Sequence, residues 1–213
     1  MMPKRYGLLL SCFDYSPVAE DEFHDWYDTE HIPERERVHG FLQCQRWIAV
    51  DRPKASIATY DLDAFDVLRS PGYLAIGYEN NSPWTRRVGW RCVKLLRSEA
   101  EQIVPGDALP PKQSEALLVW GFNLDGVSDD ALIDWCAGVY LRLARECEGI
   151  EAARLFRSKA STHDFVALVH LSNVDAVKTG EWRRYVEGPW LERFGSNERD
   201  RFRMLARRYV RHA

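Results

Sequence analysis

The chain has 213 residues, and its 29 Lys and Arg against 32 Asp and Glu give a formal net charge of −3. This balance argues against nucleic acid as a partner, because phosphate binding needs an excess of basic residues. The longest apolar run near the start, Tyr6–Leu10, is too short for a membrane span or a signal sequence, so we expect a cytoplasmic protein with no membrane contact.

Apolar periodicity predicts the element order βαββαβ twice. The expected elements are, in chain order, a strand over 5–13, a helix over 21–36, strands over 41–50 and 56–62, a broken helix over 63–87 and a strand over 90–97, then a strand over 116–123, a helix over 129–146, strands over 151–157 and 165–171, a helix over 175–194 and a strand over 201–210. This order is the ferredoxin-like motif, an α+β fold. The strand over 116–123 is apolar on both faces, so we expect the two sheets to pack face to face as a barrel within one chain.

Short motifs support an internal duplication. The matching positions are the string P-W-x-x-R-x-G at residues 83–89 and 189–195, Trp26 and Trp135, and Gly40 and Gly149. The domains expected from this duplication are a first repeat over 1–103, a Pro-rich linker over 104–113, and a second repeat over 114–213. Five scattered cysteines without C-x-x-C spacing favour neither a zinc site nor a disulfide framework.

One segment of the first repeat resembles a known family. Residues 22–33 read E-F-H-D-W-Y-D-T-E-H-I-P, and residues 38–41 read V-H-G-F. This pattern is similar to the first-helix signature of dimeric α+β barrel proteins, and most similar to their EthD-like subgroup. The resemblance implies a pocket between sheet and helices and a small-molecule activity, such as cofactor-free monooxygenation, cyclisation, dehydration or isomerisation. Some relatives in this family bind haem.

Four polar side chains of the first repeat, His24, Tyr27, Asp28 and His31, have the spacing of one helical stripe. The matching positions of the second repeat, at an offset of 109, are Ile133, Cys136, Ala137 and Tyr140. At these positions the first repeat carries ionisable or hydrogen-bonding side chains, whereas the second repeat carries mostly apolar ones. We therefore expect the active site in the first repeat.

Together with the resemblance, this stripe suggests catalytic roles. We expect His31 to be a general acid or base, Asp28 to orient it and raise its basicity, and Tyr27 to stabilise developing negative charge. Pro33 should end or kink the helix just after His31, where carbonyl groups would favour the imidazolium. The alternatives are a surface histidine, or a metal triad that includes His24. We expect no metal, since such triplets are common on helices without one.

Further candidates for substrate binding lie on the strands and beside the stripe. They are His24, Gln43, Gln45, Trp47, Tyr60 and His170. Tyr60 and His170 match near an offset of 110, and a satisfied core histidine is the alternative for His170. The segment Tyr73–Asn81 is interpreted either as a lid over the pocket or as an irregular helix.

The chain has no G-x-G-x-x-G, P-loop or G-x-S-x-G motif, which leaves nucleotide cofactors and triad hydrolysis without support. The favoured hypothesis is a cofactor-independent lyase or dehydratase, isomerase or cyclase. It would use histidine to move protons on a small apolar or aromatic carbonyl compound. The alternatives are a cofactor-free or haem-dependent monooxygenase, and a non-catalytic small-molecule-binding barrel. A homodimer of the fused chain also remains open.

Overall fold

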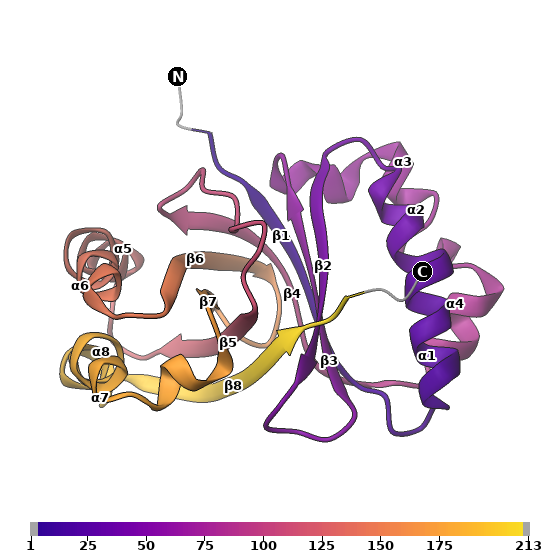
Figure 1. Cartoon of the computed structure of the whole chain (residues 1–213). Coiled ribbons are helices and arrows are strands. Elements are labelled where there is room, and N and C mark those ends of the chain that lie inside the picture. Colours follow the sequence, from indigo (N-terminus) through magenta and orange to yellow (C-terminus); the bar gives the residue numbers. More distant parts are fainter. Residues whose placement is uncertain (1–3, 211–213) are drawn as a thin grey trace.

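The computed structural model describes residues 4–210, which form a closed barrel of antiparallel strands with helices on two opposite sides (Figure 1). The strands are β1 (Gly7–Asp14), β2 (Phe41–Ala49), β3 (Ala55–Leu62), β4 (Val93–Val104), β5 (Ala116–Leu124), β6 (Ile150–Ala160), β7 (Phe165–Leu171) and β8 (Glu198–Arg208). The α+β class and the barrel predicted from the sequence are confirmed.

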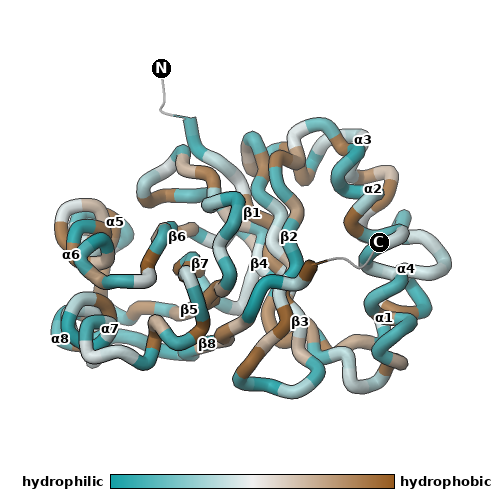
Figure 2. Tube along the Cα trace, in the orientation of Figure 1, coloured by the Kyte–Doolittle hydropathy of each residue, from teal (hydrophilic) through white to brown (hydrophobic). Residues whose placement is uncertain are grey.

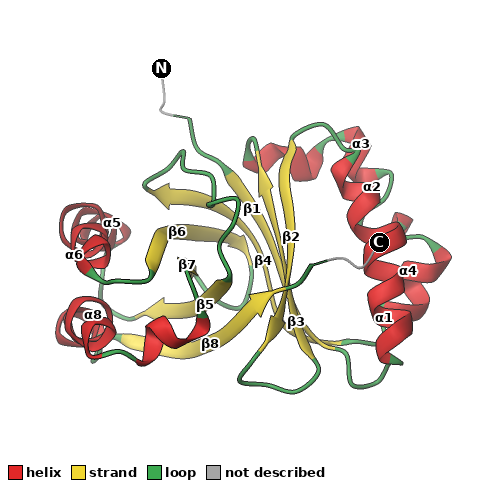
Figure 3. Ribbon diagram, in the orientation of Figure 1, coloured by secondary structure: helices red, strands yellow, loops and turns green. Residues whose placement is uncertain are grey.

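Helical segments cover the outside of the barrel (Figure 3). In the first half they are α1 (Glu20–Trp26), the π-helical turn η1 (Tyr27–His31), α2 (Ile32–Glu36), η2 (Phe65–Arg69), α3 (Pro71–Leu74), η3 (Tyr78–Asn80) and α4 (Pro83–Val88). In the second half they are α5 (Asp129–Trp135), the π-helical turn η4 (Cys136–Tyr140), α6 (Leu141–Glu146), η5 (Val174–Lys178), α7 (Gly180–Trp182), the π-helical turn η6 (Arg183–Glu187) and α8 (Gly188–Phe194). Several begin at a hydroxyl side chain that accepts a backbone N–H bond, as Ser82 and Ser128 do.

The strand order around the barrel is β1-β3-β2-β8-β5-β7-β6-β4. The four strands of each half are therefore neighbours, and the halves join where β2 pairs with β8 and where β4 pairs with β6. Because every edge strand finds a partner in the other half, the barrel leaves no free sheet edge.

The apolar side chains form three buried clusters. Leu117 and Val119 of β5 point into the barrel, whereas Leu118 and Trp120 point outward, beneath the helices of the second half. A separate cluster lies between the helices and strands of the first half. The expectation that both faces of the sheets are buried is therefore confirmed.

Two glycines mark the turn after the first helical region of each half. Gly40 has φ +97°, and a Cβ there would lie 2.5 Å from Val67 Cγ2. Gly149 has φ +88°, and a Cβ there would lie 2.8 Å from Ala176 Cβ. Both positions therefore combine a left-handed backbone with a close approach, which only glycine tolerates well.

Some predicted boundaries differ from the structure. The broken helix over 63–87 is a series of short segments, and β4 begins at Val93 and reaches Val104, so residue 104 belongs to a strand rather than to the linker. Of the two outcomes expected just after His31, a helix end or a kink, the helix end is wrong, because α2 continues to Glu36. Pro33 lies in the first turn of α2, where its missing N–H is not needed, and Ile32 donates to the Tyr27 carbonyl across the wider π turn.

Hydrophobic and hydrophilic residues are interspersed along the elements of both halves (Figure 2). Within residues 4–210, no helix is long and apolar enough to cross a membrane.

Candidate functional site

A cavity of about 710 Å³ opens between the outer face of the first-half sheet and the helices that cover it. Its walls come from β1, β3 and β4, from the η1–α2 region, and from the segment between α3 and β4. Of the residues predicted from the sequence to form the site, His31 and Tyr60 line this cavity.

His31 is the histidine of the cavity wall. Its Nδ1 is buried without a hydrogen-bond partner among residues 4–210, and its ring lies 4.3 Å from that of Trp26, centroid to centroid. Burial, together with the positive charges of Arg35 and Arg46, holds the pKa of His31 well below its ordinary value of 6.5. The imidazole is therefore neutral at neutral pH, and the expected rise in its basicity is wrong.

Arg35 and Tyr60 also line this cavity. Arg35 is 4% exposed, and its Nη1 donates to the His31 carbonyl at 2.9 Å, whereas its Nε has no partner in the described part of the chain. The Tyr60 hydroxyl is also buried, with no partner that the structure describes, and burial raises its pKa well above 10.0, so it stays a proton donor. Buried polar atoms are normally satisfied, so these three groups keep unused hydrogen-bonding capacity next to the cavity.

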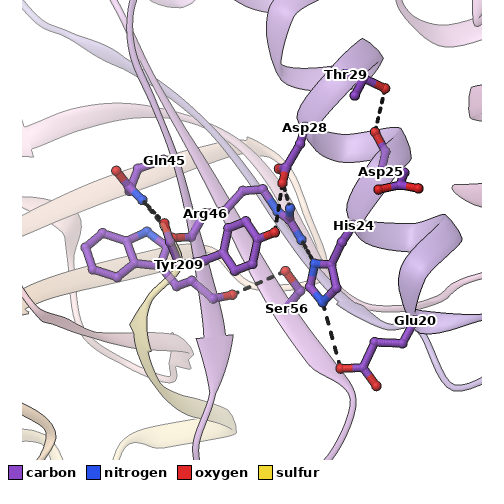
Figure 4. Close-up of polar contacts among 10 residues, drawn as sticks. Glu20, His24, Asp25, Asp28, Thr29, Gln45, Arg46, Ser56 and Tyr209 are labelled. Carbon is purple, nitrogen blue, oxygen red and sulfur yellow. Dashed lines mark hydrogen bonds and ion pairs between the residues drawn. The ribbon is translucent and has the colours of Figure 1, made fainter. Parts of the chain in front are cut away.

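Asp28 and His24 lie in a different cluster, around Arg46 of β2 (Figure 4). Arg46 Nη1 donates to Asp28 Oδ1 at 2.7 Å, and Arg46 Nη2 lies 2.8 Å from His24 Nδ1. The Tyr209 hydroxyl donates to Asp28 Oδ2 at 2.8 Å, and the Tyr209 ring stacks on His24. The structure therefore places Asp28 with Arg46 and Tyr209, and the expectation that it orients His31 is wrong.

Tyr27 is fully buried, and its side chain does not belong to the cavity lining. Its ring packs at 4.3 Å from the Arg46 guanidinium carbon and at 5.1 Å from the His31 ring. The π turn separates Tyr27, on the Arg46 side, from His31, on the cavity side. The stripe expected from a regular helix is thus divided between two environments.

The candidates on the strands lie elsewhere. Trp47 and His170 lie inside the barrel, 5.8 Å apart between ring centroids, and His170 Nε2 is 3.2 Å from Arg154 Nη2. Gln43 and Gln45 line a groove at the barrel rim. None of these four lines the 710 Å³ cavity.

The predicted match of Tyr60 with His170 is also wrong. Leu9 pairs with Tyr60 in the first half, and Leu118 pairs with Val169 in the second half. The register therefore matches Tyr60 with Val169 and matches His170 with Asp61, which explains why Tyr60 faces the helices while His170 faces the barrel.

The segment over 73–81 contributes Tyr73, Tyr78 and Asn81 to the cavity wall. Trp90, which is 62% exposed, stands at the same wall. The segment therefore lies against the cavity, and its short helical pieces α3 and η3 agree equally with the alternative of an irregular helix.

Sequence reasoning missed three basic residues of the cavity, namely Arg35, Lys94 and Arg97. A signal for Arg35 was present, because the matching residue of the second repeat is Ala144. Lys94 and Arg97 gave no comparable signal, since their common orientation depends on an irregularity in β4.

The equivalent space in the second half is filled. The cavity there has about 20 Å³ and is closed by Trp120, Tyr140 and Trp190. Trp120 and Tyr140 stand where the first half has Ser11 and His31. Open space and polar lining therefore occur together in the first half.

No family model matches the chain, and no curated protein matches it. Solved structures match it over nearly its full length. An anthrone oxidase-like protein has a TM-score of 0.65 at 9% identity, covering 98% of this chain and 92% of that one. A protein described as a chlorite dismutase has a TM-score of 0.65 at 13% identity, covering 97% and 96%. A protein of Fusobacterium nucleatum described as a monooxygenase has a TM-score of 0.60 at 10% identity, covering 98% and 94%.

These neighbours are dimeric α+β barrel proteins, so the expectation from the first-helix motif is confirmed at the level of the fold. At such identities the likeness concerns the fold, and the chemistry has to be argued from the residues of this chain.

Proposed function

We propose that the chain is a fused pair of ferredoxin-like repeats, with the EthD-like first repeat carrying the active site. The repeats would span residues 1–103 and 114–213. The common strand order of the two halves supports this division, because each half contributes four adjacent strands in the same sequence order.

For the activity, we propose a cofactor-independent enzyme that removes a proton from a carbon next to a carbonyl group of an aromatic compound. The observation that carries this proposal is the cavity lined by His31, Arg35 and Tyr60, each of which keeps a buried polar atom without a partner among the described residues. A neutral imidazole accepts a proton, and a guanidinium with a phenol hydroxyl stabilises an enolate oxygen.

In the proposed step, His31 takes the proton and the electron pair of the C–H bond moves to the carbonyl oxygen. Arg35 and Tyr60 would stabilise the resulting enolate, and the enolate charge in turn offsets the cost of a buried imidazolium. Return of the proton to another carbon gives an isomer, and loss of a β-hydroxyl as water gives a dehydrated product.

A second candidate begins with the same deprotonation. The names of the anthrone oxidase-like and monooxygenase-like neighbours favour it. In this reaction an aromatic methylene and O2 give a ketone and water, so that one oxygen atom enters the product and the other leaves in water.

Haem fits the residues poorly. A histidine that ligates a metal normally donates its other ring N–H to a carboxylate or a carbonyl, whereas Nδ1 of His31 has no partner among the described residues. The matching position in the second half is Tyr140. We therefore derive no step through haem.

The test uses anthrone as the probe and follows exchange of its methylene protons in D2O by NMR without oxygen. We expect His31→Gln to slow exchange by about 100-fold or more, since general base catalysis contributes that much. His39→Gln, at an exposed histidine outside the cavity, is the matched control. Equal exchange by wild type and His31→Gln would contradict the proposal. Adding oxygen separates the two candidates, because oxygen uptake with anthraquinone formation occurs only in the second.

A further inference from the structure

We propose that the substrate of this cavity is an aromatic acid, bound as its carboxylate. This inference rests on the proposed function and specifies the substrate class of the same site.

The first argument is the charge of the cavity wall. Arg35, Lys94 and Arg97 line it, and none of the carboxylate side chains within residues 4–210 does. Lys94 forms no ion pair with any residue that the structure describes. The wall therefore presents an excess of positive charge to any occupant.

The neighbouring carboxylates do not remove this excess. Glu99 pairs with both Arg97, at 2.8 Å, and Arg69, at 3.1 Å, so one negative charge serves two guanidinium groups. Arg35 approaches Glu34 only at 3.4 Å and keeps its Nε unpartnered although it is buried. A buried, incompletely paired guanidinium is costly unless a ligand completes its pairing.

The second argument is the geometry of β4. Residues three apart on a regular strand point to opposite faces, yet Lys94 and Arg97 both line the cavity. A register shift between Cys12 and Phe13 of β1, where β4 advances by an extra residue, brings the two cations to the same face. Bulges of this kind redirect side chains next to functional sites.

The third argument is the aromatic content of the same wall. Rings from α1, β3, the 73–81 segment and the turn before β4 face the cavity, and they are those of Trp26, Tyr60, Tyr73, Tyr78 and Trp90. Aromatic side chains favour a flat apolar body, and the cations favour an acid group on it. An aromatic carboxylate combines both properties.

The experiment compares 2-naphthoate with 2-naphthamide, its uncharged isostere, by isothermal titration calorimetry at low ionic strength. We expect the acid to bind about tenfold more tightly, in the range of charge-assisted hydrogen bonds. Lys94→Gln should weaken binding of the acid severalfold and leave binding of the amide unchanged. Arg35→Met should do the same more strongly.

Lys178→Gln is the control, because this exposed lysine lies outside the cavity. Equal affinity for acid and amide, equal effects of Lys94→Gln and Lys178→Gln, or no binding of 2-naphthoate at millimolar concentration would each overturn the inference. Lys94 is exposed, so its replacement keeps the test valid even where Arg35→Met fails to fold.

The same measurements separate this inference from the proposed function. His31→Gln should retain the preference for 2-naphthoate while losing proton exchange. Retained exchange in this variant contradicts the proposed base but leaves the acid preference standing. If the wild-type protein exchanges the anthrone protons but binds 2-naphthoate no more tightly than 2-naphthamide, only the inference is contradicted.

Discussion

Arg154 of β6 donates through Nη1 to Asp61 of β3 and thereby joins the two halves of the chain inside the barrel. Both residues are buried, with 2% of Arg154 and 1% of Asp61 exposed. Nη2 of the same guanidinium contacts Nε2 of His170, the counterpart of Asp61 in the second half. This network positions the halves relative to each other. Burial raises the pKa of Asp61 above its ordinary value, although the charge and the hydrogen bond of Arg154 oppose that rise.

Asp61→Ala should therefore destabilise the chain strongly, because it leaves a buried guanidinium uncompensated. We expect a loss of about 3–5 kcal/mol in the free energy of unfolding, measured by urea denaturation. The double variant Asp61→Leu with Arg154→Met should recover much of that loss. Asp63→Asn, at a partly exposed ion pair with Lys4, is the control and should change stability by less than about 1 kcal/mol. A loss below about 1 kcal/mol for Asp61→Ala would show that the network contributes little.

The second prediction concerns Ser11, whose counterpart Trp120 fills the equivalent space of the second half. Ser11→Trp should occupy the cavity and abolish binding of 2-naphthoate, while the fold is kept because the new ring has about 710 Å³ in which to pack. Ser11→Ala is the matched control and should bind normally. Retained binding by a folded Ser11→Trp variant would place the ligand elsewhere.

The barrel was predictable from the sequence because both of its signals are local. Consecutive apolar residues such as Leu117 and Leu118 indicate a strand that is buried on both faces. The repeated glycines, Gly40 and Gly149, mark turns with positive φ. The helix end expected near Pro33 was wrong because a π turn precedes that proline. The residue types of the segment do not reveal the π turn or its changed backbone hydrogen bonds.

The site was harder to predict, because it depends on register. A π turn divides Tyr27 and His31 between two environments, and a one-residue shift decides that Tyr60 faces the cavity while His170 faces the barrel. Lys94 and Arg97 share a face only because β4 is irregular. Such shifts arise from tertiary packing and leave no trace in residue spacing.

The third prediction is a loss of stability in mild acid. Burial and neighbouring arginines lower the pKa of His31 and of His170 well below 6.5 in the folded chain. Between those lowered values and about 6.5 the unfolded chain binds more protons, so stability falls as the pH is lowered through 6.5. Each histidine should contribute a slope of about 1.4 kcal/mol per pH unit.

Urea denaturation between pH 5 and pH 8 measures this slope. His170→Asn and His31→Gln should each reduce it, whereas His39→Gln, at an exposed histidine, should leave it unchanged. An unchanged slope in both buried-site variants would mean that other groups cause the acid sensitivity.

The last prediction separates the two clusters of the helical stripe. Asp28 accepts hydrogen bonds from Arg46 and Tyr209, and the structure gives it no bond to His31. Asp28→Asn keeps the shape and one acceptor oxygen but removes the negative charge opposite Arg46. We therefore expect a loss of stability of about 1–3 kcal/mol, the range for a hydrogen bond to a charged group, with the pH profile of proton exchange retained.

Tyr209→Phe is the matched variant, because it removes only the hydroxyl that donates to Asp28 Oδ2. It should cost less stability than Asp28→Asn and leave proton exchange of anthrone unchanged. If Asp28 instead acted through His31, Asp28→Asn would lower kcat and shift the acidic limb of the pH profile. Tyr209→Phe would produce a smaller shift of the same kind. A retained profile in both variants assigns the Arg46 cluster to holding Tyr209 against α1.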